Sequence, residues 1–226
     1  MIKLIAFDWN GTLISDTAIC LKAENFAMES VGQKAMSMLT FKKYFDIPIT
    51  KFWKDAGFNE KIFRKHFAKI EDNFHKNYER LANKARTRSG AKEVLKWLEK
   101  NKILSVIYSN HNHPNILRQL IRLKIEKYIA TIVARQEHDH SQLFQRYKAE
   151  KLHVYLTDKN IKPRQVVSVG DTEEEIQIGK QYGFHTVAIT GGYNTTSRLK
   201  KHHPDFLIHN MKELIGIIKK LNHRSA

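Results

Sequence analysis

Two aspartates stand where apolar runs of the chain end, and their side chains could bind a metal ion or attack a substrate. Asp8 directly follows the apolar residues 2–7, and Asp171 follows the β-branched residues 165–169 after one glycine. Carboxylate oxygens are the ligands that Mg²⁺ prefers, and a carboxylate can also act as a nucleophile. This chemistry requires the fold to bring the two distant aspartates together.

The pattern of the surrounding residues predicts how that happens. Further strand-like runs cover residues 103–108, 129–134, 186–189 and 206–208, and helical patterns cover 91–100, 114–123, about 142–159 and 174–183. Alternation of strands and helices is typical of a parallel sheet with right-handed crossovers. Ligands of such sheets bind beyond the carboxyl ends of the strands, where both aspartates are expected.

Residues 16–85 follow a different pattern. Residues 18–31 are helix-like, and residues 59–81 place apolar side chains at spacings of three and four, which indicates an amphipathic helix. No clear strand lies in this stretch. We therefore expect a helical domain over residues 16–85, inserted into an α/β core domain made of residues 1–15 and 86–226.

Three motifs in this order resemble those of one enzyme family. They are Asp8-Trp9-Asn10-Gly11-Thr12-Leu13, Ser109-Asn110 and Gly170-Asp171-Thr172. The chain resembles the haloacid dehalogenase (HAD) superfamily over nearly its whole length, and within it the phosphoglycolate-phosphatase-like members. The resemblance implies a Rossmann-like parallel sheet with an inserted all-α cap of the C1 type. It also implies a Mg²⁺-dependent phosphatase that forms an aspartyl-phosphate on Asp8.

The same resemblance assigns the other site residues. Asp171 would bind the metal. Glu175 stands at the position of a further family acid; it could bind the ion directly, contact it through water, or anchor the loop. A lysine would neutralise the phosphate; Lys148 fits best, with Lys151 as the competitor. The expected metal ligands are Asp8, Asn10 through its main-chain carbonyl, Asp171 and Glu175, and the expected phosphate ligands are Ser109, Asn110 and Lys148.

Asn10 departs from the family pattern. Related phosphatases carry an aspartate there, which protonates the leaving oxygen and later activates water. An amide does neither, and loss of a general acid or base typically costs ~10²–10⁴ in rate. The departure favours leaving groups that need little protonation, such as aryl or acyl phosphates, or a phosphoenzyme that persists. It also supports an alternative function as a catalytically impaired phosphate-binding or regulatory protein, or a phosphotransferase.

Composition narrows the remaining possibilities. The chain of 226 residues has 42% hydrophobic residues, a single cysteine and no apolar run long enough for a bilayer, so a cytoplasmic protein without membrane association is expected. The net charge of +16 suits an anionic substrate such as a small phosphorylated metabolite, but a lysine-rich, solvated helical surface is the explanation we favour. It leaves a nucleic-acid partner possible, although no nucleic-acid-binding motif is present. The oligomeric state stays open.

Two histidine pairs also follow expected strands. His111 and His113 follow one strand, and His138 and His140 follow the next. They could form a transition-metal site, since histidine is the commonest metal ligand, or serve as polar loop residues near the start of a helix.

Overall fold

The computed structural model describes residues 1–136 and 148–223. A six-stranded sheet in the order β5-β4-β1-β6-β7-β8 forms its centre, and every neighbouring pair is parallel. The strands are β1 (Leu4–Phe7), β4 (Leu104–Asn112), β5 (Thr131–Arg135), β6 (Val166–Gly170), β7 (His185–Ile189) and β8 (Phe206–Ile208). The α/β Rossmann-like prediction is therefore confirmed.

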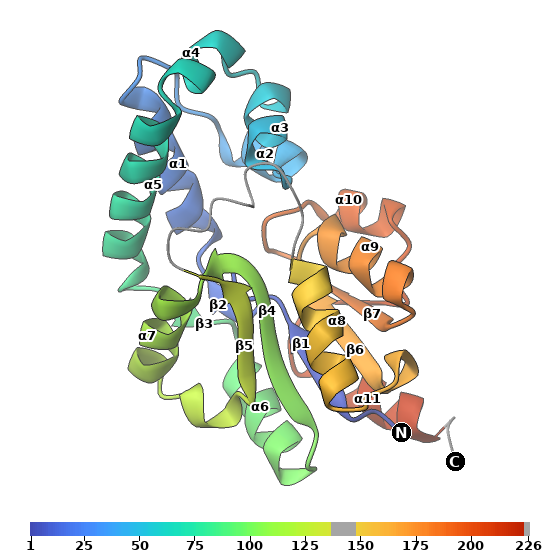
Figure 1. Ribbon diagram of the computed structural model, residues 1–226. Helices are drawn as coiled ribbons and strands as arrows, with labels where there is room; N and C mark the ends of the chain where they lie inside the picture. The colour runs from blue at the N-terminus through green and yellow to red at the C-terminus, as the bar shows by residue number, and fades with distance from the viewer. Residues whose placement is uncertain (137–147, 224–226) are drawn as a thin grey trace.

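Helices cover both faces of this sheet (Figure 1). In β1 the side chains alternate between two cores, with Ile5 and Phe7 on one face and Leu4 and Ala6 on the other, which explains its continuous apolar sequence. Residues of α6, α7 and α11 pack on the first face, and residues of α8 and α9 on the second. The bounds are α6 (Ala91–Lys100), α7 (His113–Leu123), η1 (Glu126–Tyr128), α8 (Lys148–Asp158), η3 (Pro163–Gln165), α9 (Glu173–Tyr182), α10 (Thr196–Lys201) and α11 (Glu213–His223).

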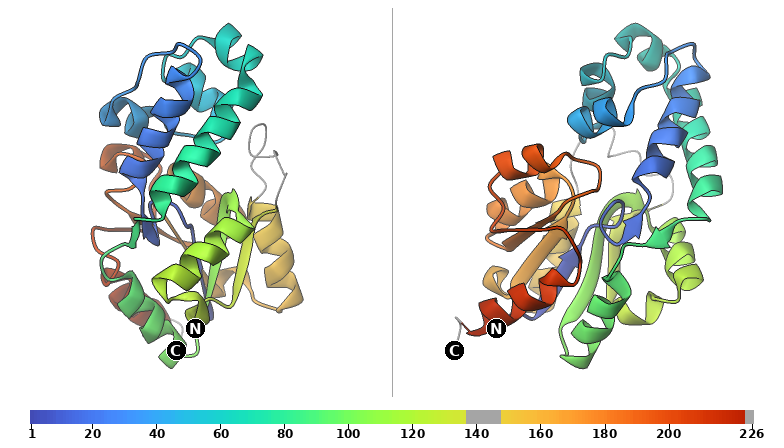
Figure 2. Two further views of the ribbon diagram at one scale, coloured as in Figure 1. Left: turned by 90° about the vertical axis from the view of Figure 1, so that its left-hand side faces the viewer. Right: turned by 180° about the vertical axis from the view of Figure 1, so that it is seen from behind.

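The first five helices of the chain form a helical block over residues 17–82. They are α1 (Thr17–Glu29), α2 (Met38–Tyr44), α3 (Ile49–Asp55), α4 (Glu60–Lys65) and α5 (Phe67–Ala82). The block has its own aromatic-rich core and lies beyond the carboxyl ends of the strands (Figures 1 and 2). Two short antiparallel strands, β2 (Ile14–Ser15) and β3 (Arg86–Thr87), pair where the chain enters and leaves the block.

Several elements differ from the sequence prediction. The helix expected over residues 59–81 is broken at His66, and Phe63 and Phe67 on either side of the break both pack on Trp53, with ring centroids 5.5 and 5.8 Å away. Helices α2 and α3 were not expected. Strand β4 runs on to Asn112, four residues beyond the predicted end, through an irregular register.

Two predictions fall outside the described residues. They concern His138 and His140, and the first part of the helix expected from about residue 142. Within the described ranges, no helix combines the length and apolar character needed to cross a membrane.

Candidate active site

The turn after β1 places Asp8 at the carboxyl edge of the sheet. The main-chain N–H of Asp8 donates to the Val169 carbonyl at 2.9 Å, so this turn lies against the end of β6. Gly11 has a φ of +74°, and a Cβ at this position would collide with the Asp171 carboxylate. Glycine is therefore required here for both its backbone conformation and its lack of a side chain.

Lys148, the first residue of α8, also reaches this edge of the sheet. Its Nζ lies 3.3 Å from Asp8 Oδ1 and 2.8 Å from Glu174 Oε2, and it also contacts Glu175 Oε1. The Lys148 side chain is buried, whereas Lys151 is exposed. Of the two lysines considered from the sequence, Lys148 is the one that lies among the carboxylates.

This buried cluster holds more carboxylates than cations. Burial raises the pKa of Asp8 well above its ordinary value; the Lys148 ammonium opposes this shift, and the carboxylates of Glu175, Asp171 and Glu174 add to it. Burial alone would lower the pKa of Lys148, but the surrounding carboxylates raise it well above its usual value. The lysine is therefore held as a cation, and Asp8 takes up a proton more readily than an exposed aspartate does.

Asp171 lies under the same turn. Its Oδ1 accepts a hydrogen bond from Thr12 Oγ1 at 2.6 Å, and its Oδ2 accepts one from the Tyr193 N–H. Burial, followed by the charge of Glu175, raises the pKa of Asp171 to about 7. Each carboxylate oxygen keeps a lone pair, so these hydrogen bonds orient Asp171 without preventing it from binding a cation.

Glu175 is already engaged by two neighbours. Its Oε1 contacts Lys148, and its Oε2 accepts hydrogen bonds from the Thr172 N–H at 3.0 Å and from Thr172 Oγ1 at 2.6 Å. The contacts with Thr172 form a capping box at the start of α9. Glu175 therefore anchors the loop after β6 and positions the lysine.

Ser109 and Asn110 lie inside β4 and line the same cavity as Asp8. The Ser109 hydroxyl accepts a hydrogen bond from the His111 N–H at 3.2 Å, and Asn110 Nδ2 donates to Glu174 Oε2 at 2.9 Å. His111 also lines the cavity, and its Nε2 is 3.3 Å from Glu79 Oε1 on α5. His113 is the first residue of α7. The structure thus places Ser109 and Asn110 at the same cavity as Lys148, the third expected phosphate-binding residue.

Asn10 belongs to a second polar cluster, centred on Asp16, which sequence reasoning missed. Asn10 Nδ2 donates to Asp16 Oδ2 and to the Tyr78 hydroxyl, both at 2.7 Å. Asp16 Oδ2 also accepts from the hydroxyls of Tyr78 at 2.6 Å and Tyr193 at 2.9 Å, and Oδ1 accepts from the Gly11 N–H at 2.7 Å. The cluster joins the turn after β1 to α5 and to the loop after β7.

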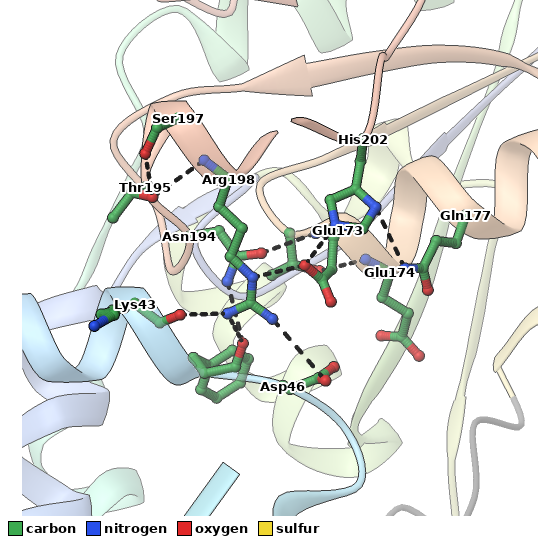
Figure 3. Close-up of polar contacts among 12 residues, drawn as sticks. Lys43, Asp46, Glu173, Glu174, Gln177, Asn194, Thr195, Ser197, Arg198 and His202 are labelled. Carbon is green, nitrogen blue, oxygen red and sulfur yellow. Dashed lines mark hydrogen bonds and ion pairs between the residues drawn. The ribbon is translucent and has the colours of Figure 1, made fainter. Parts of the chain in front are cut away.

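A further contact between the block and the core lies at α10 (Figure 3). Arg198 donates to the Phe45 carbonyl at 2.7 Å and to Glu173 Oε2 at 2.6 Å, and Asn194 Nδ2 donates to the same carbonyl at 3.2 Å. His202 also contacts Glu173, at 2.9 Å. The segment between α2 and α3 is therefore fixed to the start of α9.

Between the block and the sheet edge lies a cavity of about 120 Å³. Its floor carries Asp8, Ser109, Asn110 and Lys148, and its other walls come largely from the helical block. Within the described part of the chain, no group of three or more His, Cys, Asp or Glu side chains is arranged to hold a metal ion. A cation here would therefore need ligands besides acidic side chains.

Comparisons with known proteins place these features in a family. A model of the haloacid dehalogenase-like hydrolases matches residues 5–189. A pyrophosphatase PpaX from Oceanobacillus iheyensis is 26% identical, with 96% of this chain and 97% of that protein covered. A phosphoglycolate phosphatase from Haemophilus influenzae is 25% identical, with coverage of 96% and 98%. A haloacid dehalogenase-like family hydrolase from Streptococcus pneumoniae has the same fold, with a TM-score of 0.81, 17% identity and coverage of 96% and 98%.

Proposed function

This chain belongs to the haloacid dehalogenase-like hydrolase family, and from that premise we propose that it hydrolyses a small phosphomonoester through an aspartyl-phosphate on Asp8. The observation that carries the proposal is the pairing of Asp8 with the buried Lys148 in the cavity at the carboxyl edge of the sheet. Relatives named phosphoglycolate phosphatase and pyrophosphatase agree with phosphoryl-transfer chemistry.

The residues at the floor of the cavity have separate roles in the proposed reaction. An ionised Asp8 oxygen attacks phosphorus as the bond to the leaving oxygen breaks, and water then cleaves the acyl phosphate to release phosphate and restore Asp8. Lys148 offsets negative charge on the phosphoryl oxygens, and the Ser109 hydroxyl and Asn110 amide bind them. Glu175 holds Lys148 in position. These groups are preorganised because the lysine is buried among acids.

The donor set suits Mg²⁺. The excess of buried carboxylates around Lys148 is the kind of environment that a divalent cation stabilises, and oxygen is its preferred ligand. Asp8, the main-chain carbonyl of Asn10 and Asp171 would hold the ion, with waters and substrate oxygens as further ligands. When bound, Mg²⁺ would withdraw electron density from a phosphoryl oxygen and screen Asp8 from the substrate's charge.

We also propose that residues 16–85 act as a cap domain over the core formed by residues 1–15 and 86–226. The separate aromatic core of the helical block and its position over the cavity support this division. The cap would exclude water and select the organic part of the substrate.

The alternative function, a phosphate-binding or regulatory protein or a phosphotransferase, rests on Asn10. Its side chain is committed to Asp16 and Tyr78. Asn10 therefore offers no acid to protonate a leaving oxygen and no base to activate water. Under this alternative Asp8 would be phosphorylated without efficient hydrolysis, or phosphate would bind without reaction.

Phosphate release from a panel of phosphomonoesters, with and without Mg²⁺, separates these functions. We expect Mg²⁺-dependent turnover by the wild type and none by Asp8→Asn. Intact-mass measurement of the quenched enzyme would show a phosphoryl adduct of about 80 Da that Asp8→Asn lacks. An adduct that accumulates without turnover would favour the phosphotransferase. If the wild type shows no adduct and no turnover, the catalytic proposal is contradicted.

A further inference from the structure

The walls of the cavity above Asp8 are rich in aromatic side chains. Phe45, Trp53, Phe67 and Phe74 line it from the helical block, and Trp53 packs against Phe67 with ring centroids 5.8 Å apart. Aromatic faces attract cations through the negative charge density above the ring. These walls therefore favour an apolar or cationic group over an anionic one.

A buried carboxyl group lies in the same wall. Glu24, on α1, is 2% exposed, and its Oε2 accepts a hydrogen bond from Trp53 Nε1 at 3.2 Å. Because burial is opposed only by this one hydrogen bond, the pKa of Glu24 is raised to about 7. An ammonium group beside Glu24 would stabilise its ionised form.

Glu71, the other acid that lines the cavity from the helical block, has two neighbours of basic type. Glu71 lies 3.6 Å from His75 and 3.9 Å from Arg135. Among the described residues that line the cavity, Lys148 is the only lysine or arginine, and it is surrounded by carboxylates on the floor. Glu24 is therefore the acid that a ligand cation would meet in the upper part of the cavity.

We propose that the substrate is the phosphomonoester of an amino alcohol, with its ammonium group against Glu24 and the aromatic walls and its phosphoryl group at Asp8. The inference rests on the proposed function and narrows its substrate class. It separates this chain from the phosphoglycolate phosphatases among its relatives, because the carboxylate of phosphoglycolate would face Glu24.

Asn10 is consistent with the same substrate class. An ammonium group close to the ester oxygen withdraws electrons and makes the leaving alkoxide less basic. Such a leaving group depends less on protonation during bond cleavage. The substitution that removes the family's general acid is therefore better tolerated with an amino alcohol than with a simple alcohol.

Three esters of similar size test the proposal: phosphoethanolamine, ethyl phosphate and phosphoglycolate, whose organic parts are cationic, neutral and anionic. Their binding to Asp8→Asn in the presence of Mg²⁺ can be measured by calorimetry, without turnover. We expect phosphoethanolamine to bind at least about tenfold more tightly than phosphoglycolate, with ethyl phosphate between them. Equal or tighter binding of phosphoglycolate would overturn the inference, as would a failure of all three to bind.

A substitution at Glu24 tests the cause of this order. Adding Glu24→Gln to Asp8→Asn keeps the shape of the side chain and an acceptor for Trp53, and should reduce the preference for phosphoethanolamine to less than about threefold. The matched control is Glu29→Gln, an exposed glutamate on the same helix, which should leave the preference unchanged. An unchanged preference in a folded Glu24→Gln variant would remove Glu24 from the proposal.

Turnover of the same esters by the wild type separates this inference from the proposed function. If the expected binding order is found but no phosphate is released, the recognition of the amine stands and the hydrolase proposal fails. If phosphoglycolate is both bound and hydrolysed best, the hydrolase proposal stands and the amine proposal fails.

Discussion

Asp8 and Asp16 flank the same turn and are both buried, yet their surroundings differ in the supply of hydrogen-bond donors. Asp16 accepts from Asn10, Tyr78, Tyr193 and the Gly11 N–H. Asp8 has the Lys148 ammonium at 3.3 Å, which also serves two glutamates. Both pKa values are raised by burial, but the four hydrogen bonds to Asp16 oppose the rise, whereas neighbouring carboxylates add to it at Asp8.

The difference indicates what each carboxylate does. A buried charge whose oxygens are fully hydrogen-bonded stabilises the fold, because its donors come from segments that must stay together. A buried charge with too few donors lowers stability unless a ligand supplies the missing partners, and such groups concentrate at functional sites. Asp16 therefore joins the helical block to the core, and the surroundings of Asp8 agree with the ligand-binding role proposed for it.

Asp8→Asn tests this comparison with the largest expected effect. Phosphate release should fall by at least about 10⁴-fold, because an amide does not form the covalent intermediate. The free energy of unfolding should stay the same or rise, because one of several mutually repelling carboxylates is removed. Steady-state assays and urea titrations measure the two quantities; a large loss of stability would contradict the assignment of Asp8 to ligand binding.

Asp16→Ala should mainly affect stability. It leaves the donors of Asn10, Tyr78, Tyr193 and Gly11 without their acceptor, and each buried donor left unpaired costs about 1–3 kcal/mol. We expect a loss of about 3 kcal/mol or more in chemical denaturation. A stability within about 0.5 kcal/mol of the wild type would show that the cluster does not hold the two parts together.

Glu24 offers an intermediate case, with a single donor. Its folded pKa of about 7 exceeds the ordinary value of 4.5, so the folded state binds the proton more tightly and stability falls as pH rises from about 4.5 to 7. Between pH 5 and pH 8 this amounts to about 2 kcal/mol. Urea titrations at pH 5 and pH 8 measure this decrease in the free energy of unfolding. In Glu24→Gln the decrease should be smaller by about 2 kcal/mol, and in Glu29→Gln it should equal that of the wild type.

Asn10→Asp sharpens the comparison by adding a carboxylate to the donor-rich cluster. The new oxygens would replace an amide that donates to Asp16 and Tyr78, so two carboxylates would compete for the same donors. We expect a stability loss of about 1–2 kcal/mol and no gain in the hydrolysis of alkyl phosphates. A gain for alkyl over aryl phosphates would show instead that the side chain turns toward the substrate as a general acid.

Tyr193→Phe has the smallest expected effect. It removes one of several hydrogen bonds to Asp16 and leaves the ring packing on Phe45 intact, at 4.7 Å between centroids. The cost should be about 1 kcal/mol, measured by thermal and chemical denaturation. A much larger loss would mean that the donors act cooperatively rather than independently.

The parallel sheet and the positions of Asp8 and Asp171 could be predicted from the sequence because they depend on local patterns. Apolar runs followed by an acid and a glycine indicate strand ends, and strand order in such folds follows general rules. Lys148 could be favoured over Lys151 from the resemblance. The family and the α/β fold predicted from these local patterns are both confirmed.

The Asp16 cluster could not be predicted, because its members are distant in sequence. Tyr78 is part of the apolar stripe of a helix, and Tyr193 follows a Gly-Gly turn, so each is explained locally without a polar partner. The orientation of Asn10 depends on these partners, so its hydrogen bonds to Asp16 and Tyr78 could not be predicted either. The packing of Phe63 and Phe67 on Trp53 likewise joins residues of different helices.

The pairing of β2 with β3 has a consequence for how such a molecule can change. Ile14 faces Thr87 and Ser15 faces Arg86 in an antiparallel ladder, so the two strands form a β-hairpin in which five helices replace the usual tight turn. The points where the chain leaves β2 and returns in β3 are therefore one interstrand spacing apart, about 5 Å. An insert of another size or shape could therefore enter at this hairpin without altering the order of the central strands. If the block selects the substrate as proposed, substrate choice could then evolve, or be engineered, separately from the chemistry of the sheet edge.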